Sequence, residues 1–235
     1  LDQSLVKQLR SSILLLGALS AKQNHFSLSH PGGCVIGARP VDTHMDALQK
    51  LGVAVTKTEQ GYEIDATNRQ AAMVVLRESS VTATENVLML ASVLPGTTII
   101  KLAACEPHVE DLCRFLNMLG ARITGLGTTT LSVEGSADLG SGEHTLIPDA
   151  NEAATFLILG AATNSPITVV NAREEHLDAV LEKLREFGVG FTIEEESITV
   201  IPAKQLKAVS KVDTRIYPGI PTDVQAPFGI LATQA

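Results

Sequence analysis

The sequence predicts a mixed α/β protein built from a repeated β-α-β-α-β-β unit. Three segments carry the same pattern, in which an apolar helical stripe ends at a glycine and two short strands follow: Val41–Ala66, Val109–Gly135 and His176–Ile201. The residue numbers of the three glycines, Gly52, Gly120 and Gly188, differ by 68 at each step. A fixed period of this size indicates one supersecondary unit used several times.

The helix in each segment is predicted from its apolar spacing. In the third copy, apolar residues follow the i, i+3, i+4 rule of a helix face: Leu177, Val180, Leu181, Leu184 and Phe187. The second copy has a similar stripe from Val109 to Leu119. The glycine after each stripe is expected to end the helix in a left-handed conformation.

A second helix and a strand are predicted before each of these segments. The three expected helix–strand pairs are Ser11–Leu19 with Phe26–Leu28, Asn86–Leu94 with Thr97–Leu102, and Glu152–Ala162 with Ile167–Val170. Capping-box patterns at Thr82-x-x-Glu85 and Thr222-x-x-Gln225 predict two helix starts. Both ends of the sequence fall inside a unit, from which we expect it to be part of a longer chain.

Composition excludes several classes of protein. The net charge is −8 and no stretch concentrates Lys or Arg, which argues against a nucleic-acid partner. Aromatic residues are only 3% of the chain, and no apolar run approaches the roughly 20 residues that span a bilayer. Three cysteines without a C-x-x-C spacing predict neither disulfides nor a zinc site and favour a reducing cytoplasm. No metal and no cofactor is expected.

The least generic stretch is Pro31–Asp42, which reads PGGCVIGARPVD. Its glycines predict an exposed loop around Cys34, and the next helix is expected to begin near Pro40. A helix N-terminus close to Arg39 would attract anions and lower the pKa of a thiol. The simpler interpretation is an incidental loop cysteine beside a helix start. No G-K-[ST] follows, so this is not a Walker loop.

This stretch resembles the active-site loop of the UDP-N-acetylglucosamine 1-carboxyvinyltransferases, a branch of the enolpyruvyl transferase family. Further motifs of that family follow in its order along the chain: Leu5–Ile13, Glu106-Pro107, Pro148–Phe156, Asp178–Arg185 and Tyr217–Ala226. The resemblance implies an inside-out α/β barrel of β-α-β-α-β-β units in two globular domains. Residues 1–147 would then belong to the first domain, and residues 148–235 to the second.

The resemblance also implies a reaction. The family transfers the enolpyruvyl group of phosphoenolpyruvate to the 3′-hydroxyl of UDP-N-acetylglucosamine and releases phosphate, the first committed step of peptidoglycan synthesis. Such a transfer needs a base for the hydroxyl, an acid for the methylene carbon, and cations for the phosphate and carboxylate. The implied partners are these two small molecules, and the oligomeric state is left open.

By the same resemblance, site residues can be assigned. Cys34 matches the cysteine associated with acid catalysis and fosfomycin capture, and Asp223 matches the proposed base, which also binds substrate. The remaining matches to substrate-binding positions are Arg10, Arg39, Pro40, Val41, Asp42, Thr43, Ser80 and Val81. Asp223 has a simpler interpretation as a helix-start acid, and a helix N-terminus would make it an ionised but weak base.

Other residues depart from the family pattern. Cys105 and Glu78 stand where a basic residue is usual, His108 replaces an acid, and Ala150 replaces an arginine. His30 replaces an apolar residue before the PGGC loop. Cys113 falls on an apolar helix stripe, so we expect it in the core. His44, one turn into its helix, is expected to face substrate or cap the helix rather than bind metal.

Three alternatives stay open at this point. The chain could be a catalytically dead remnant that binds a nucleotide sugar, or a shikimate-pathway enolpyruvyl transferase. A thiol hydrolase would need a histidine such as His44 and an acid near Cys34. Further cationic residues of the family's site have no counterpart in the sequence, so we expect the 235-residue chain alone to be inactive or nearly so.

Overall fold

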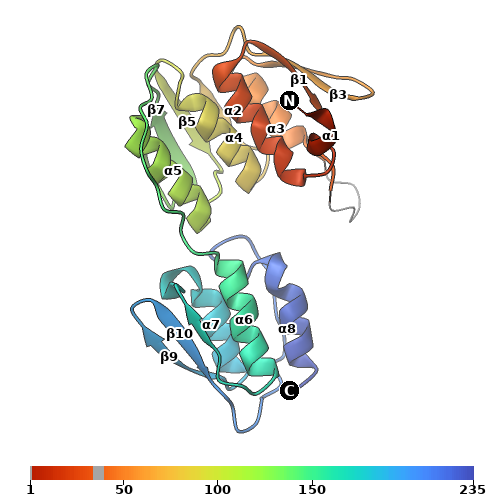
Figure 1. Cartoon of the computed structure of the whole chain (residues 1–235), viewed down its shortest axis with the longest axis vertical. Coiled ribbons are helices and arrows are strands. Elements are labelled where there is room, and N and C mark those ends of the chain that lie inside the picture. The colour runs from red at the N-terminus through yellow and green to blue at the C-terminus, as the bar shows by residue number, and fades with distance from the viewer. Residues whose placement is uncertain (1, 34–39) are drawn as a thin grey trace. The chain divides into compact units, whose positions relative to one another are not determined.

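The structure is a computed structural model that describes residues 2–33 and 40–235 (Figure 1). The chain forms two compact units, Leu1–Thr145 and Leu146–Ala235. The division falls two residues before the boundary expected from the sequence. Each unit has its own apolar core and is described separately below.

The first unit contains two sheets and the helices that cover them. Its elements, in chain order, are α1 (Gln3–Val6), the 3₁₀ helix η1 (Arg10–Leu14), α2 (Leu15–Lys22), β1 (His25–Ser29), α3 (Asp42–Lys50), β2 (Ala54–Lys57), β3 (Gly61–Asp65), β4 (Met73–Val75), α4 (Val81–Ala91), β5 (Thr97–Lys101), α5 (Pro107–Leu119), β6 (Arg122–Thr124) and β7 (Thr130–Glu134). One sheet has the antiparallel order β1-β3-β2. The other has the order β4-β5-β7-β6, with only β4 and β5 parallel.

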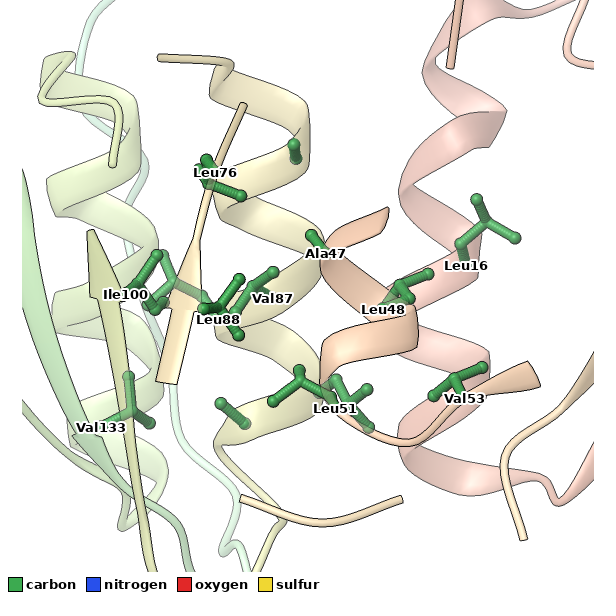
Figure 2. Packing of buried hydrophobic residues seen from close by; sticks show 14 of the residues in the cluster. Leu16, Ala47, Leu48, Leu51, Val53, Leu76, Val87, Leu88, Ile100 and Val133 are labelled. Carbon is green, nitrogen blue, oxygen red and sulfur yellow. The ribbon is translucent and has the colours of Figure 1, made fainter. Parts of the chain in front are cut away.

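Helix α4 lies at the centre of the first unit, where it packs against α2, α3, α5 and β5. Figure 2 shows Val87 and Leu88 of α4 between Ile100 of β5 and Leu51 of α3. These side chains are fully or almost fully buried. The contact with α2 is close, because a Cβ atom at Gly17 would collide with the backbone of Asn86.

The second unit is a smaller version of the same design. Its elements are α6 (Ala150–Ala162), β8 (Thr168–Val170), the 3₁₀ helix η2 (Glu174–His176), α7 (Asp178–Glu186), β9 (Gly190–Glu194), β10 (Ser197–Ile201), the 3₁₀ helix η3 (Thr222–Val224) and α8 (Gln225–Ala232). The sheet has the antiparallel order β8-β10-β9. Helix α6 packs against α7, α8 and β10, and the rings of Phe187 and Phe228 stack in the core, their centroids 6.2 Å apart (Figure 1).

The repeat predicted from the sequence is confirmed. A helix followed by a two-stranded hairpin occurs three times, as α3-β2-β3, α5-β6-β7 and α7-β9-β10. In each copy the second hairpin strand also pairs, antiparallel, with the strand that precedes the helix. The full order β-α-β-α-β-β runs from β4 to β7.

The predicted glycine stops are also confirmed. Gly52, Gly120 and Gly188 have φ angles of 82°, 116° and 87°, a region that side chains with a Cβ atom avoid. Each follows the last turn of its helix, and its N–H donates to a carbonyl of that turn. The helix and its following strand therefore meet at a residue that only glycine suits.

The two predicted capping boxes are wrong. Helix α4 begins at Val81, and Ser80 caps it by accepting a hydrogen bond from the Ala83 N–H at 3.3 Å. Thr82 therefore lies inside the first turn and is free to contact another helix. Thr222 belongs to η3, which begins after Pro221 without a side-chain cap. In both places the chain enters the helix at a different residue from the one that the local pattern indicates.

Candidate functional site

Several residues of the sequence-predicted site lie in the first unit near the N-termini of α3 and α4, whereas Asp223 belongs to the second unit. Helix α3 begins at Asp42, whose side chain is exposed, while the next residue, Thr43, is buried. Helix α4 begins at Val81 after its cap, Ser80. Helix N-termini carry backbone N–H groups without intrahelical partners, so they favour anionic ligands such as phosphates.

Two side-chain contacts join these helix starts. The hydroxyl of Thr43 donates to Oε1 of Glu78 at 3.0 Å. One residue further along α3, Nε2 of His44 lies 2.7 Å from Oγ1 of Thr82. The first turn of α3 is thus tied to the segment 78–82, which contains the start of α4. Thr43 therefore lies close to the start of α4, which contains Ser80 and Val81.

His44 is buried, with 6% of its surface exposed. Burial lowers its pKa below the usual 6.5, and the nearby charge of Arg10 lowers that pKa further. The backbone of Val41 and the charge of Glu78 act in the opposite direction. The imidazole is therefore neutral at pH 7 and suited to a hydrogen bond with a hydroxyl group. The expectation that His44 caps its helix is wrong, because its ring contacts Thr82 instead.

Arg10 begins η1 and lies beside the residues that lead into the PGGC loop. A Cβ atom at Gly33, where φ is +70°, would lie 3.2 Å from the Arg10 nitrogen and 2.8 Å from the Gln8 carbonyl oxygen. The charge of Arg10 also lowers the pKa of Tyr62, against the larger effect of burial, which raises it. Arg10 thus lies close enough to both His44 and Tyr62 for its charge to act on them.

Asp42 acts on the same tyrosine with the opposite sign, since its charge raises the Tyr62 pKa. The ring of Tyr62 meets the ring of His30 edge to face, with centroids 4.9 Å apart. Arg10 and Asp42 thus both act on Tyr62, whose ring also contacts His30, the residue before the PGGC loop.

Cys34 and Arg39 lie outside the described residues. The described chain resumes at Pro40, which is exposed, and Val41 is buried as the residue before α3. The backbone carbonyl of Val41 accepts from the N–H groups of His44 and Met45, at 3.0 and 3.2 Å. The predicted helix start near Pro40 is confirmed to within two residues.

Asp223 belongs to the second unit. It is an exposed residue of η3, between Thr222 and the fully buried Val224. Burial of Val224 in the core turns the neighbouring Asp223 outward, where solvent reaches its carboxylate. Asp223 therefore lies in the first turn of a short helix, which agrees with its simpler interpretation as a helix-start acid.

The other cysteines have structural explanations. Cys113 is buried in the core, as predicted, and burial raises the pKa of its thiol to about 12. Cys105 is half-buried, and its thiol donates to the Ala103 carbonyl at 3.7 Å. Burial, with the charges of Glu106 and Glu110, raises the Cys105 pKa. Neither of these two thiols is activated.

Within residues 2–33 and 40–235, no three His, Cys, Asp or Glu side chains gather as ligands of a metal ion would. None of the helices in these ranges combines the length and apolarity needed to cross a bilayer.

Fold and site together define an α/β repeat protein whose candidate ligand site lies at two adjoining helix N-termini. A sequence model of the EPSP synthase (3-phosphoshikimate 1-carboxyvinyltransferase) family matches residues 1–235. The chain therefore belongs to this family of enolpyruvyl transferases.

Two curated relatives bear the name UDP-N-acetylglucosamine 1-carboxyvinyltransferase. The protein from Campylobacter hominis is 42% identical over 233 residues, and the one from Sulfurimonas denitrificans is 43% identical over 235 residues. Each alignment covers 98% of this chain and 55% of the relative. The chain thus spans about half the length of the curated relatives it matches.

Solved structures show the same fold. The enolpyruvyl transferase NikO from Streptomyces tendae matches with a TM-score of 0.85 at 22% identity, over 100% of this chain and 56% of NikO. An EPSP synthase from Acinetobacter baumannii matches with a TM-score of 0.67 at 20% identity, over 95% of this chain and 51% of that protein. The predicted enolpyruvyl transferase fold is confirmed.

The sequence patterns do not reveal how Glu78, His44 and Thr82 are used at the candidate site. They mark Glu78 and His44 only as single positions, and they assign Thr82 as a helix cap. Their partners lie 35 and 38 residues away in sequence. A pattern of neighbouring residues carries no signal for such pairs, although a polar residue on a buried helix face, such as His44, is a hint.

Proposed function

We propose that the protein containing this chain transfers the enolpyruvyl group of phosphoenolpyruvate to the 3′-hydroxyl of UDP-N-acetylglucosamine, releasing phosphate, as a step of peptidoglycan synthesis. The observation that carries this proposal is the junction of the α3 and α4 N-termini beside Arg10. A nucleotide sugar offers a diphosphate, and two helix N-termini with a guanidinium group supply the N–H groups and positive charge to bind it. The names of the two curated relatives support the same substrate.

The proposed binding residues follow from this arrangement. Residues 40–43 and the pair Ser80 and Val81 would line the nucleotide sugar, because they form the two joined helix starts. Arg10 and Arg39 would neutralise the phosphate and carboxylate charges. The domains of the complete enzyme would correspond to the two units seen in this chain.

The proposed chemistry uses one acid and one base. Asp223 would accept the proton of the sugar hydroxyl as its oxygen attacks C2 of the enolpyruvyl group, and Cys34 would supply a proton to C3. The resulting tetrahedral adduct then loses a proton from C3 and a phosphate from C2, which restores the double bond. Developing negative charge on the phosphate would be stabilised by the arginines.

We place this reaction in the cytoplasm. Cys105 and Cys113 are both free thiols, as is usual in a reducing compartment. The proposed substrates are small molecules, and no metal or cofactor is required for the transfer.

A phosphate-release assay on the complete natural protein tests the proposal. Phosphoenolpyruvate is supplied with UDP-N-acetylglucosamine or, separately, with 3-phosphoshikimate. Phosphate should be released when the acceptor is UDP-N-acetylglucosamine and not when it is 3-phosphoshikimate. Phosphate release with 3-phosphoshikimate but not with the nucleotide sugar would assign the shikimate-pathway reaction instead. Binding of the nucleotide sugar without phosphate release would identify a protein that binds but does not catalyse.

Fosfomycin tests the role of Cys34 separately. Intact-mass spectrometry should detect one covalent adduct, formed faster in the presence of UDP-N-acetylglucosamine. Cys34→Ser should abolish this adduct, and the matched variant Cys105→Ser should retain it. An adduct that persists in Cys34→Ser would contradict the assignment of Cys34 as the reactive thiol.

A further inference from the structure

The two contacts between α3 and the segment 78–82 use polar groups that are withdrawn from water. Thr43 and His44 are 8% and 6% exposed, although both side chains are polar. A buried polar group is unfavourable unless it has a hydrogen-bond partner. The Thr43 hydroxyl and Nε2 of His44 each have one, from the other helix start, Glu78 for Thr43 and Thr82 for His44, while Nδ1 of His44 is buried without a partner among the described residues.

Other buried side chains of α4 are held in a similar way. Oδ1 of Asn86 accepts from the Gly17 N–H at 2.5 Å, and the hydroxyl of Thr84 accepts from the Ala104 N–H at 3.0 Å. Both acceptors are fully buried. The first turns of α4 are therefore fixed to α2 and to the segment before α5. Further along α3, Asp46 accepts from Arg77 and Lys50 donates to the Val75 carbonyl, whereas Thr43 and His44 make the side-chain contacts at its N-terminus.

We infer that His44, Thr82, Thr43 and Glu78 are positioning residues. Their side chains hold the N-termini of α3 and α4 in the relative position that lets both helix ends bind the same nucleotide sugar. This inference rests on the proposed function. The two contacts are adjacent on α3 and reach residues four apart on the other segment, so together they restrain rotation of α3 as well as its distance. A site formed by two helix ends loses affinity when one end shifts relative to the other, because both ends must contact the same ligand.

Glu78 is explained by the same inference. A carboxylate beside a diphosphate would repel it. In the structure Oε1 of Glu78 accepts a hydrogen bond from the hydroxyl of Thr43, which directs this carboxylate oxygen toward α3. The residue thus acts through Thr43 and has no need to contact the ligand.

The test uses Thr82→Val in the complete natural protein, with Thr82→Ser as the conservative variant. Removal of the hydroxyl should raise KM for UDP-N-acetylglucosamine by about 3–10-fold, the factor expected for one hydrogen bond. KM for phosphoenolpyruvate should change less than about 2-fold, and Thr82→Ser should restore the value for the nucleotide sugar.

The matched control is Thr163→Val, a threonine at the end of α6 whose hydroxyl donates to the Leu159 carbonyl within its own helix. It should leave both KM values unchanged. If Thr82→Val lowers the melting temperature but leaves KM for the nucleotide sugar unchanged, the contact is structural only and the inference is overturned.

Amide hydrogen exchange tests the inference independently of the substrate. Thr82→Val lies in α4, yet exchange should accelerate in the first turn of α3, at residues 43–46. An unchanged rate there would overturn the inference even if the wild-type protein transfers no enolpyruvyl group. If the wild-type protein does not use UDP-N-acetylglucosamine but the exchange rate in α3 rises, the proposed function fails while the positioning role stands.

Discussion

Helices α4 and α6 hold the same place in the repeat, but their buried faces differ in chemistry. Counted from their capping residues, Ser80 and Asp149, the buried Leu88 of α4 corresponds to the buried Leu157 of α6. By the same count, the buried Thr84 and Ser92 of α4 correspond to the buried alanines Ala153 and Ala161 of α6. One helix buries hydroxyl groups where the other buries only methyl groups.

The same contrast holds for the two units as wholes. Ten polar side chains are buried among the described residues, and all belong to the first unit: Ser12, Ser20, Ser29, Thr43, His44, Thr84, Asn86, Ser92, Thr98 and Asp111. The second unit is described throughout, and its buried side chains are all apolar. The repeat can therefore fold on apolar packing alone. Buried polar groups are an addition of the first unit, and several of them hold the candidate site.

The largest predicted effect removes apolar packing from the second unit. Phe187→Ala deletes a fully buried ring that stacks on Phe228. We expect a loss of about 3–5 kcal/mol of unfolding free energy in urea titrations, from lost burial and the cavity left behind. A loss below about 1 kcal/mol would contradict the conclusion that this core depends on apolar packing alone.

The three repeat glycines sharpen the comparison between copies. Gly120→Ala places a Cβ atom in ordinary van der Waals contact, 3.9 Å from the Asp138 carbonyl oxygen, so only the left-handed backbone opposes it, at about 1–2 kcal/mol. Gly52→Ala adds a collision with the Asn68 carbonyl oxygen and should cost about 1–3 kcal/mol more. Gly188→Ala, at 3.5 Å from the flexible Lys207, should resemble Gly120→Ala. Thermal unfolding of the three variants checks this order, and equal losses would refute it.

The buried polar groups of α4 should stabilise the first unit through hydrogen bonds as well as by filling space. Asn86→Leu keeps the approximate volume but removes the acceptor of the Gly17 N–H. We expect a loss of about 1–3 kcal/mol from the unpaired N–H group. The corresponding residue of α6, Thr155, is exposed, and Thr155→Ala should change stability by less than about 0.5 kcal/mol. A neutral Asn86→Leu would remove the contrast between the two helices.

The smallest predicted effect concerns Glu85, whose counterpart in α6 is the buried Ala154. Burial, and then the charge of Glu106, raise the pKa of Glu85 from 4.5 to about 7. The folded protein therefore holds a proton that the unfolded chain releases, so this group makes stability fall as pH rises from about 4.5 to 7.

Glu85→Gln should remove this pH dependence. Its stability relative to wild type should rise across that interval, by on the order of 1 kcal/mol after allowance for partial solvent screening. Urea titrations at pH 5 and pH 8 measure the difference. A relative stability that is the same at both pH values would show that Glu85 is ionised in the folded protein already at pH 5.

The sequence by itself determined the repeat, its α/β class and the glycine that ends each copied helix. These features depend on residues close together in the chain: an apolar stripe at helical spacing and a glycine with positive φ. The family motifs likewise mark Arg10, Asp42 and Ser80 as candidate site residues, and all three lie in the first unit.

The tertiary structure alone decided what the first turn of α4 touches. Thr82 has the local pattern of a cap, yet Ser80 caps the helix, and the Thr82 hydroxyl pairs with His44 of α3. The pairing of Thr43 with Glu78 arises in the same way. Local patterns report interactions over three or four residues, whereas these contacts exist only because two helix ends meet in space.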